Sequence, residues 1–521
     1  MQKFGRLAAF TNRKERTLIL LLCFAAAVRI FIFCAAFPFF TEVDEDLHFD
    51  LVLRYSLGRV PRTFDLLSKE SLDWIVLYAS PEFIQTPDQF PEGKFPPPLW
   101  KQSGPEAEEV IAVTRAAWST EINFESSQPP LYYSLGAVWL RLGQRLGLTG
   151  IESLYWIRFS NVPLIALLVW LGYVAARTIG PERFELRIGV PLLLAFIPQD
   201  VFYSINSDVL SPICVGVLFL CVLRWLRPEP PALWLGICTG LAIAATYLTK
   251  LANLPLLSVA LIAIVATCSR PALPGRISAR RQDIATTAPI ARQKFGPRLA
   301  AFAALVLCAA IPIGAWMMWT KYNFGGVTGS TTKIALLGWT RKPLADWWRH
   351  PIFTPRGLWV FWSDLLATFW RGEIKWQNHP LGWRTANAFY SISSLLLLGS
   401  ALAGMRRRAG LSAFQRQALA IAGLSFLASV GFFALLSIQF DFGSCVNPSR
   451  EHPYFASGRL MSGALIPFAL LYVYGLERLC RRLGAGRLSL LVLTVIVAFV
   501  TTSEIIVNRV AFASEHNWFH L

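Results

Sequence analysis

The stretch that decides the fold is TLILLLCFAAAVRIFIFCAA at residues 17–36, followed directly by FPFFTEVDEDLHFD at residues 37–50. The first stretch is apolar apart from Arg29 and is long enough, as a helix, to cross the hydrocarbon core of a bilayer. It is longer than the apolar part of a signal peptide, and no small-residue cleavage site follows it. We therefore expect a retained first membrane span that places an acidic segment at the membrane surface.

Apolar stretches of similar length recur along all 521 residues, of which 54% are hydrophobic and only 16% are charged. Soluble domains carry about 25% charged residues, so the composition excludes a soluble globular protein. We predict an all-α polytopic membrane protein with about 11 transmembrane helices (10–13), and with amphipathic helices in its first extracytoplasmic loop. The predicted spans are 17–36, 159–176, 188–204, 209–224, 232–249, 251–268, 299–319, 386–405, 417–438, 458–477 and 488–507.

Positive charge orients these spans. If the stretch LYYSLGAVWLRLGQRLGL at 131–148 lies along the outer leaflet instead of crossing, the basic N-terminus and the later basic clusters all share one side. Lys and Arg in short loops resist translocation, so this arrangement is preferred, with the N-terminus cytoplasmic and the C-terminus outside. The net charge of +17 sits in clusters between spans, which excludes a nucleic-acid-binding face. The later clusters are Arg177/Arg183/Arg187, Arg224/Arg227, the linker 269–298, Arg406/Arg407/Arg408/Arg416 and Arg478/Arg481/Arg482/Arg487.

The domain organisation follows from this topology. We expect a cytoplasmic N-terminus, a transmembrane core, a basic cytoplasmic linker, a C-terminal transmembrane bundle and an extracytoplasmic tail. The N-terminus is residues 1–16, the core is 17–268 and contains the large extracytoplasmic loop 37–158, and the linker is 269–298. The C-terminal bundle is 299–507 and contains the extracytoplasmic loops 320–385 and 439–457, and the tail is 508–521.

The densest polar group of the chain lies directly after the first span, at residues 41–50. In a helix, Asp44 and His48 stand one turn apart on one face, with Glu45 beside them. Crowded carboxylates repel one another, which raises the pKa of one of them and suits it to act as a base. Asp44, Glu45 and His48 are also a possible set of ligands for a divalent cation. The alternative is an acidic helix start that interacts with the helix dipole.

Other polar residues reach the same membrane face at the ends of predicted spans. They are Gln128 in SQPPLYY (127–133), Asn206 and Asp208 after the span 188–204, Lys250 after 232–249, and Arg459 at the start of 458–477. Most of these residues also have a purely structural alternative. The side chains of Lys250 and Arg459 could snorkel to the membrane interface, and those of Asn206 and Asp208 could cap a helix. Arg29 lies deep in the first span and needs either a cavity or a structural pair with a neighbouring helix.

This set of residues resembles the GT-C superfamily of polyprenyl-phosphate-sugar-dependent glycosyltransferases. The likeness is to protein O-mannosyltransferases, to lipid A aminoarabinose transferases, and most closely to uncharacterised bacterial membrane proteins built alike. The matching features are Asp44-Glu45 followed by His48, the segment Leu57-Gly58-Arg59-Val60-Pro61, the double proline of PPLYY, an Asn/Asp pair, Thr249-Lys250 and a late Gly458-Arg459. Two positions depart from the family pattern: Leu460-Met461 replaces a tyrosine-containing segment, and Gln128 stands where His or Lys is common.

The resemblance implies an integral glycosyltransferase of a bacterial inner (plasma) membrane, with its active face extracytoplasmic. It would be embedded in the lipid bilayer and would move a sugar from a polyprenyl-phosphate donor to an extracytoplasmic glycan, lipid or protein acceptor. Asp44 or Glu45 would be the base, and Lys250 and Arg459 would clamp the phosphate, with His48, Gln128, Asn206, Asp208 and Arg29 as further substrate-binding candidates. The alternatives are a transporter or flippase of a lipid-linked saccharide and a non-catalytic membrane scaffold.

Overall fold

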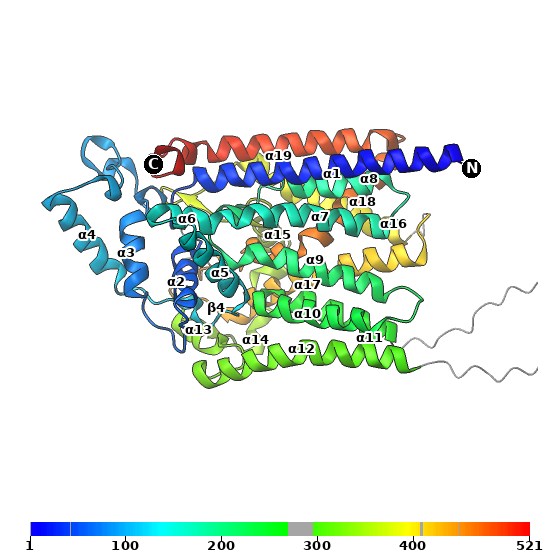
Figure 1. Cartoon of the computed structure of the whole chain (residues 1–521), viewed down its shortest axis with the longest axis horizontal. Helices are drawn as coiled ribbons and strands as arrows, with labels where there is room; N and C mark the ends of the chain where they lie inside the picture. Colours follow the sequence, from blue (N-terminus) through cyan, green and yellow to red (C-terminus); the bar gives the residue numbers. More distant parts are fainter. Residues whose placement is uncertain (1, 42, 269–294, 407–409, 446–447) are drawn as a thin grey trace, which may run out of the picture.

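The computed structural model describes residues 2–41, 43–268, 295–406, 410–445 and 448–521. It is a bundle of helices that run side by side, with the two termini at opposite ends (Figure 1). Within the described residues, nine helical segments are long and apolar enough to cross a membrane, and α10 (Leu233–Thr249) is a shorter apolar helix. The predicted all-α polytopic membrane fold is therefore confirmed. The long segments contain α1 (Gln2–Ala36), α6 (Gly150–Phe159) with α7 (Asn161–Ile179), α9 (Ser211–Trp225), α11 (Leu254–Cys268), α12 (Phe295–Phe324), α16 (Arg384–Arg406), α17 (Ala413–Gln439), α18 (Leu465–Arg482) and α19 (Ser489–Phe512).

The predicted span 188–204 is the one that differs most from the structure. Helix α8 (Phe184–Ala195) ends early, and a separate turn of 3₁₀ helix, η6 (Asp200–Tyr203), follows it. Pro198 lies in the break, and proline both lacks the amide donor of a helix and disfavours the helical conformation of the residue before it. The break leaves residues 199–208, a mixture of polar and apolar side chains, as a buried segment without regular α-helix at the end of the bundle.

The end of the bundle at which α1 stops carries the long connecting segments, and we call it the loop face (residues 37–149, 325–383 and 440–457). The segment 131–148 forms α5 (Leu131–Arg145), which packs on α2 and α6 and is not among the helices long enough to span. The helices of these segments are α2 (Glu45–Ser56), α3 (Lys69–Tyr78), α4 (Pro105–Trp118), α5, α13 (Ser330–Leu336), α14 (Leu344–Trp347) and α15 (Pro355–Arg371).

Of the two short antiparallel pairings among the described residues, one joins two of these segments and the other closes a turn within a single segment. Strand β1 (Thr340–Arg341) pairs with β4 (Phe440–Asp441), and β2 (Lys375–Trp376) pairs with β3 (His379–Pro380). Helix α15 packs against α16 and against the 3₁₀ segment η10 (Gly458–Ala464), which opens α18. The second and third long segments are thereby held beside the start of α18.

The described members of the predicted basic clusters lie in or beside the connections at the other end of the bundle. Arg183, which precedes α8, pairs with Glu477 near the end of α18. Gln415 at the start of α17 donates to Glu182 beside it. These contacts gather the connections that follow α7, α16 and α18, so the basic residues of these connections share one end. Residues 269–294 of the predicted linker, and Arg407 and Arg408, lie outside the described residues.

Candidate functional site

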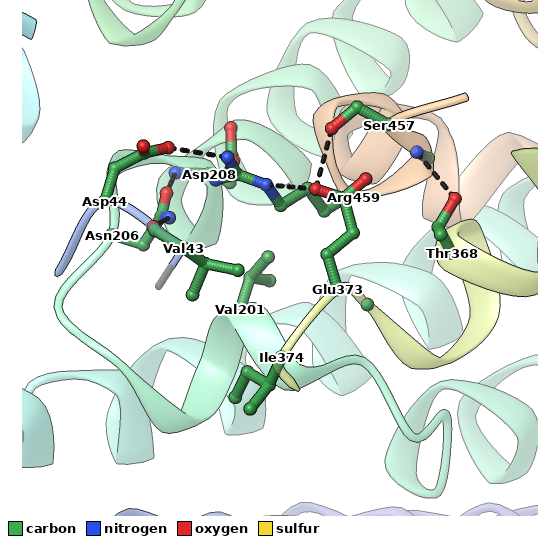
Figure 2. Close-up of polar contacts among 12 residues, drawn as sticks. Val43, Asp44, Val201, Asn206, Asp208, Thr368, Glu373, Ile374, Ser457 and Arg459 are labelled. Atoms are coloured by element: carbon green, nitrogen blue, oxygen red, sulfur yellow. Dashed lines mark hydrogen bonds and ion pairs between the residues drawn. The ribbon is translucent and has the colours of Figure 1, made fainter. Parts of the chain in front are cut away.

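Asp44 stands at the start of α2 with its backbone in the left-handed region, at φ 63° and ψ 23°. Aspartate tolerates this conformation better than most residues do. Its side chain makes no capping bond to α2. Instead, Asp44 Oδ2 accepts a hydrogen bond from Arg459 Nη2 at 2.6 Å, although 415 residues separate the two (Figure 2). The Asp44 side chain is 35% exposed, so its carboxylate is open to a ligand at the loop face.

Arg459 lies among three carboxylates. Besides Asp44, its Nε donates to Glu373 Oε2 at 2.8 Å and its Nη1 lies 3.4 Å from Asp208 Oδ2 (Figure 2). The hydroxyl of Ser457 also donates to Glu373 Oε2, at 2.8 Å. With a side chain only 11% exposed, Arg459 is fixed by its partners and does not snorkel freely.

Lys250 ends α10 and pairs with Asp208, with 2.5 Å between Nζ and Oδ1. Asp208 is fully buried in the 3₁₀ turn η7 (Ser207–Leu210). Asn206 caps this turn, because its Oδ1 accepts from the Asp208 amide at 2.9 Å while its Nδ2 donates to the Val43 carbonyl at 3.1 Å. Asn206 thus joins the backbone next to Asp44 to the backbone at Asp208, which agrees with its predicted capping role.

These five side chains form one charged cluster: Asp44, Asp208, Lys250, Glu373 and Arg459. Three carboxylates face two cations, so both cations are already neutralised by partners. A phosphate can bind here only if one carboxylate gives up its cation or takes up a proton. The predicted convergence of Asp44, Asp208, Lys250 and Arg459 at one face is present in the structure.

Glu45 lies in a different environment, and here the structure corrects the expectation of two neighbouring surface carboxylates. Its side chain is fully buried, and Arg158 binds both oxygens, with Nε 2.7 Å from Oε1 and Nη2 2.6 Å from Oε2. The backbone amides of Phe40, Thr41 and Ile205 donate to the same carboxylate. These five bonds occupy both carboxylate oxygens and leave no position for a substrate hydroxyl. Glu45 therefore holds the end of α1, α6 and the 199–208 segment together.

His48 is fully buried, and its Nδ1 lies 2.8 Å from the hydroxyl of Tyr133 in the PPLYY segment. Burial lowers the pKa of His48 to about 4. The proposed ligand set of Asp44, Glu45 and His48 does not assemble, because each residue is turned to a different partner. Across the described ranges, no three Asp, Glu, His or Cys side chains are grouped as a metal site.

Gln128 and Glu125 flank this region from the segment before α5. Gln128 Oε1 is buried and has no hydrogen-bond partner among the described residues. Glu125 pairs at 2.6 Å with Lys333 of α13, which joins the first long segment of the loop face to the second. Burial alone would raise the pKa of Glu125, but the charges of Lys333, His48 and Lys250 outweigh it and lower the pKa.

Arg29 does not belong to the charged cluster. Its Nη1 pairs at 2.5 Å with Glu504 of α19, and its Nη2 donates to the carbonyl of Ile197 at 2.8 Å. The hydroxyl of Tyr203 binds the same carboxylate. The structure thus supports the structural alternative for Arg29, a pair with a neighbouring helix.

The sequence also pointed to one carboxylate with a raised pKa, and in the structure this is Asp46. Burial, and then the charge of Asp44, raise the pKa of Asp46 to about 7. The residues that sequence reasoning missed are Glu373, Arg158 and Glu504. Arg158 and Glu504 stand among uncharged neighbours, which was their only signal, whereas Glu373 lies between Arg371 and Lys375 and had no such signal.

Comparison with solved structures gives distant likenesses. The oligosaccharyltransferase of Archaeoglobus fulgidus, in a complex with Zn and sulfate, is 15% identical over 74% of this chain and 44% of that chain, with a TM-score of 0.35. The oligosaccharyltransferase AglB of Archaeoglobus fulgidus, in a complex with an inhibitory peptide and a dolichol-phosphate, is 12% identical over 97% of this chain and 56% of that chain, with a TM-score of 0.40. This chain spans about half the length of these proteins, and likenesses at such scores carry no argument about function.

Sequence comparison is more decisive for the family. A search of curated proteins found no match. A family model described as a predicted membrane protein, DUF2142, matches residues 29–444, which include Asp44, Asp208, Lys250 and Glu373 of the charged cluster. Because the match covers most of the chain, this protein belongs to the DUF2142 family of predicted membrane proteins.

Proposed function

We propose that this chain is a membrane glycosyltransferase that moves a sugar from a polyprenyl-phosphate donor to an acceptor on the outer side of the membrane. The observation that carries the proposal is the pairing of a partly exposed carboxylate, Asp44, with Arg459, beside the Asp208–Lys250 pair. A base and two cations at one site are what the transfer of a group from a lipid phosphate requires.

In the proposed step, Asp44 removes the proton from an acceptor hydroxyl. The hydroxyl oxygen then forms a bond to the first carbon of the sugar, and the bond from that carbon to the phosphate oxygen breaks. The departing phosphate carries negative charge, which Arg459 and Lys250 would stabilise.

The charge balance of the cluster links these two events. Before reaction, Asp44 and Arg459 neutralise each other through a 2.6 Å ion pair. When Asp44 takes up the acceptor proton, its hold on the guanidinium weakens, and the cluster loses its one excess negative charge, so Nη2 of Arg459 becomes free to donate to the departing phosphate. Glu373 and Asp208 would keep Arg459 in place during this exchange.

The test uses the envelope glycans of a strain that lacks this chain, analysed by mass spectrometry after complementation with variants. We expect that Asp44→Asn loses about 10² to 10⁴ of the transfer rate, as removal of a general base does. The matched control is Asp88→Asn, the same change at an exposed position of the same loop. Both variants should be present in the membrane at the level of the unchanged protein.

Asp46→Asn is the informative comparison, because the raised pKa of Asp46 also suits a base. If Asp46→Asn abolishes transfer while Asp44→Asn retains it, the base is wrongly assigned. If Asp44→Asn restores the glycans fully, the proposed chemistry fails, and a scaffold is favoured. Accumulation of lipid-linked sugar on the inner leaflet would favour a flippase instead.

A further inference from the structure

A second polar site lies on the loop face, apart from the charged cluster. A cavity of about 570 Å³ opens between the segment 340–351 on one side and Asp441, Phe442, Arg450 and Pro453 on the other. The pairing of β1 with β4 forms one edge of it, since Thr340 lies opposite Asp441 and Arg341 opposite Phe440. The charged and titratable side chains that line it, which define the basic cavity, are Arg341, Lys342, Asp346, Arg349, His350, Asp441 and Arg450.

The basic cavity has an excess of positive charge. Arg349 pairs with Asp346 at 3.2 Å, and Arg450 pairs with Asp441 at 2.9 Å, so both carboxylates of the lining are neutralised. Within the described part of the chain, neither Arg341 nor Lys342 has an ion-pair partner. Lys342 also interacts electrostatically with Asp441, but the four cations of the lining still outnumber its two carboxylates by two.

The walls of the cavity are fixed by a buried histidine. His350 Nδ1 accepts from the amide of Ile352 at 3.1 Å, so its Nε2 carries the proton that it donates to the Pro453 carbonyl at 3.0 Å. Both nitrogens are thus used in the neutral form, and burial lowers the pKa of His350. His350 joins the two walls and adds no charge, so the excess charge comes from Arg341 and Lys342.

The cavity is also close along the chain to the charged cluster. Pro453 lines it, and Arg459 follows six residues later. Six extended residues span at most about 22 Å, so one elongated ligand is able to reach both places. The anchoring of Pro453 by His350 and of Gly458 by Thr368, whose hydroxyl accepts the Gly458 amide at 2.8 Å, fixes this stretch at both ends.

We propose that the basic cavity binds an anionic group, phosphate or carboxylate, carried by the acceptor. The acceptor part of this inference rests on the proposed function, whereas the anion site rests only on the cavity and its unpaired cations. Two cations on one wall would bind two oxygens of the anion with charge-assisted hydrogen bonds. The acceptor class that this selects is an anionic glycan, not a neutral one.

The test measures binding of inorganic pyrophosphate to the full chain in detergent, by isothermal titration. We expect the double variant Arg341→Gln/Lys342→Gln to bind about tenfold or more weakly, because each lost charge-assisted bond contributes more than a neutral one. The matched control is Arg356→Gln, an exposed arginine at the start of α15 that does not line the cavity. Pyrophosphate could also bind to Lys250 and Arg459 in the charged cluster. The comparison is therefore repeated in a Lys250→Gln background, which weakens that second site.

Equal affinity of the double variant and the unchanged protein, in both backgrounds, would overturn the anion site. The acceptor assignment has its own test in nanodiscs of phosphatidylglycerol or of phosphatidylcholine. If phosphatidylglycerol alone blocks pyrophosphate at the cavity, the occupant is a lipid headgroup, and the acceptor assignment is overturned. Since pyrophosphate binding needs no glycosyl transfer, a failure of the proposed function in the glycan experiment leaves the binding result standing.

Discussion

The adjacent carboxylates of Asp44 and Glu45 differ in their exposure and in their hydrogen-bond partners. Asp44 is partly exposed and has one strong partner, whereas Glu45 is fully buried and receives bonds from Arg158 and three backbone amides. Removing one side of a buried ion pair costs about 3–5 kcal/mol, because the other charge is left unpaired. A Glu45→Gln variant would therefore report on folding, whereas an Asp44 variant can report on chemistry.

His48 gives a prediction about pH. Its pKa is about 4 in the folded chain and about 6.5 in the unfolded chain, so the unfolded state binds the proton first as pH falls. The free energy of unfolding should then decrease between pH 6.5 and pH 4, by up to about 3 kcal/mol from this residue. His48→Gln removes the titration, and the difference in unfolding midpoint between the variant and the unchanged protein should shrink or reverse as pH falls.

The measurement is the thermal unfolding midpoint in detergent from pH 4.5 to pH 7.5. His379→Gln serves as the control, since it removes an exposed histidine of the same face. A constant difference between His48→Gln and the unchanged protein at every pH would contradict the assigned burial of His48. Comparing variants at each pH cancels the contributions of the other titrating groups, among them Asp46.

At the scale of helices, α10 and α12 pack through two glycines one turn apart on α10. A Cβ at Gly236 would overlap the carbonyl oxygen of Ala301, and a Cβ at Gly240 would lie 2.5 Å from that of Leu305. Small residues at this spacing allow membrane helices to approach closely. We expect Gly236→Ala/Gly240→Ala to separate the two helices and to cost about 1–3 kcal/mol, as overpacking does.

Gly314 on α12 is the matched control for this pair. A Cβ there meets no atom within 4 Å, so Gly314→Ala should leave the stability unchanged or raise it slightly. Thermal unfolding in detergent distinguishes the two variants. Equal midpoints for the double variant and Gly314→Ala would show that the close approach of α10 to α12 is not needed for stability.

The helices show which parts of the fold can be predicted from the sequence. A span of apolar residues has its length fixed by the bilayer, so the long helices were predictable without knowledge of their neighbours. The segment 188–204 was not, because its apolar residues continue past the point where Pro198 interrupts the helix. Burial of that segment depends on partners from α1, α2 and α7, which no local pattern reveals.

At the scale of the whole molecule, the sequence predicted where the candidate site lies but not which of its charges pair. Topology alone places Asp44, Asp208, Lys250 and Arg459 on one face, because each ends or begins a span. Which charges then pair depends on tertiary packing. Glu373 comes from the segment between α12 and α16, and it completes the cluster through a contact with Arg459 that links residues 86 apart. Such pairings depend on how all the helices pack together, so the local sequence around each residue does not predict them.

The orientation of the whole molecule supplies a final prediction. Basic connections gather at the end of the bundle opposite the loop face, and Lys and Arg in short loops remain on the cytoplasmic side. We therefore expect the loop face, with the charged cluster, to be extracytoplasmic. In a Cys445→Ser background, Thr120→Cys at the exposed end of α4 should react with a membrane-impermeant maleimide in intact spheroplasts. Leu483→Cys, exposed after α18, should react only after lysis. The opposite labelling pattern would place Asp44 and Arg459 in the cytoplasm, where an acceptor on the outer surface is out of reach.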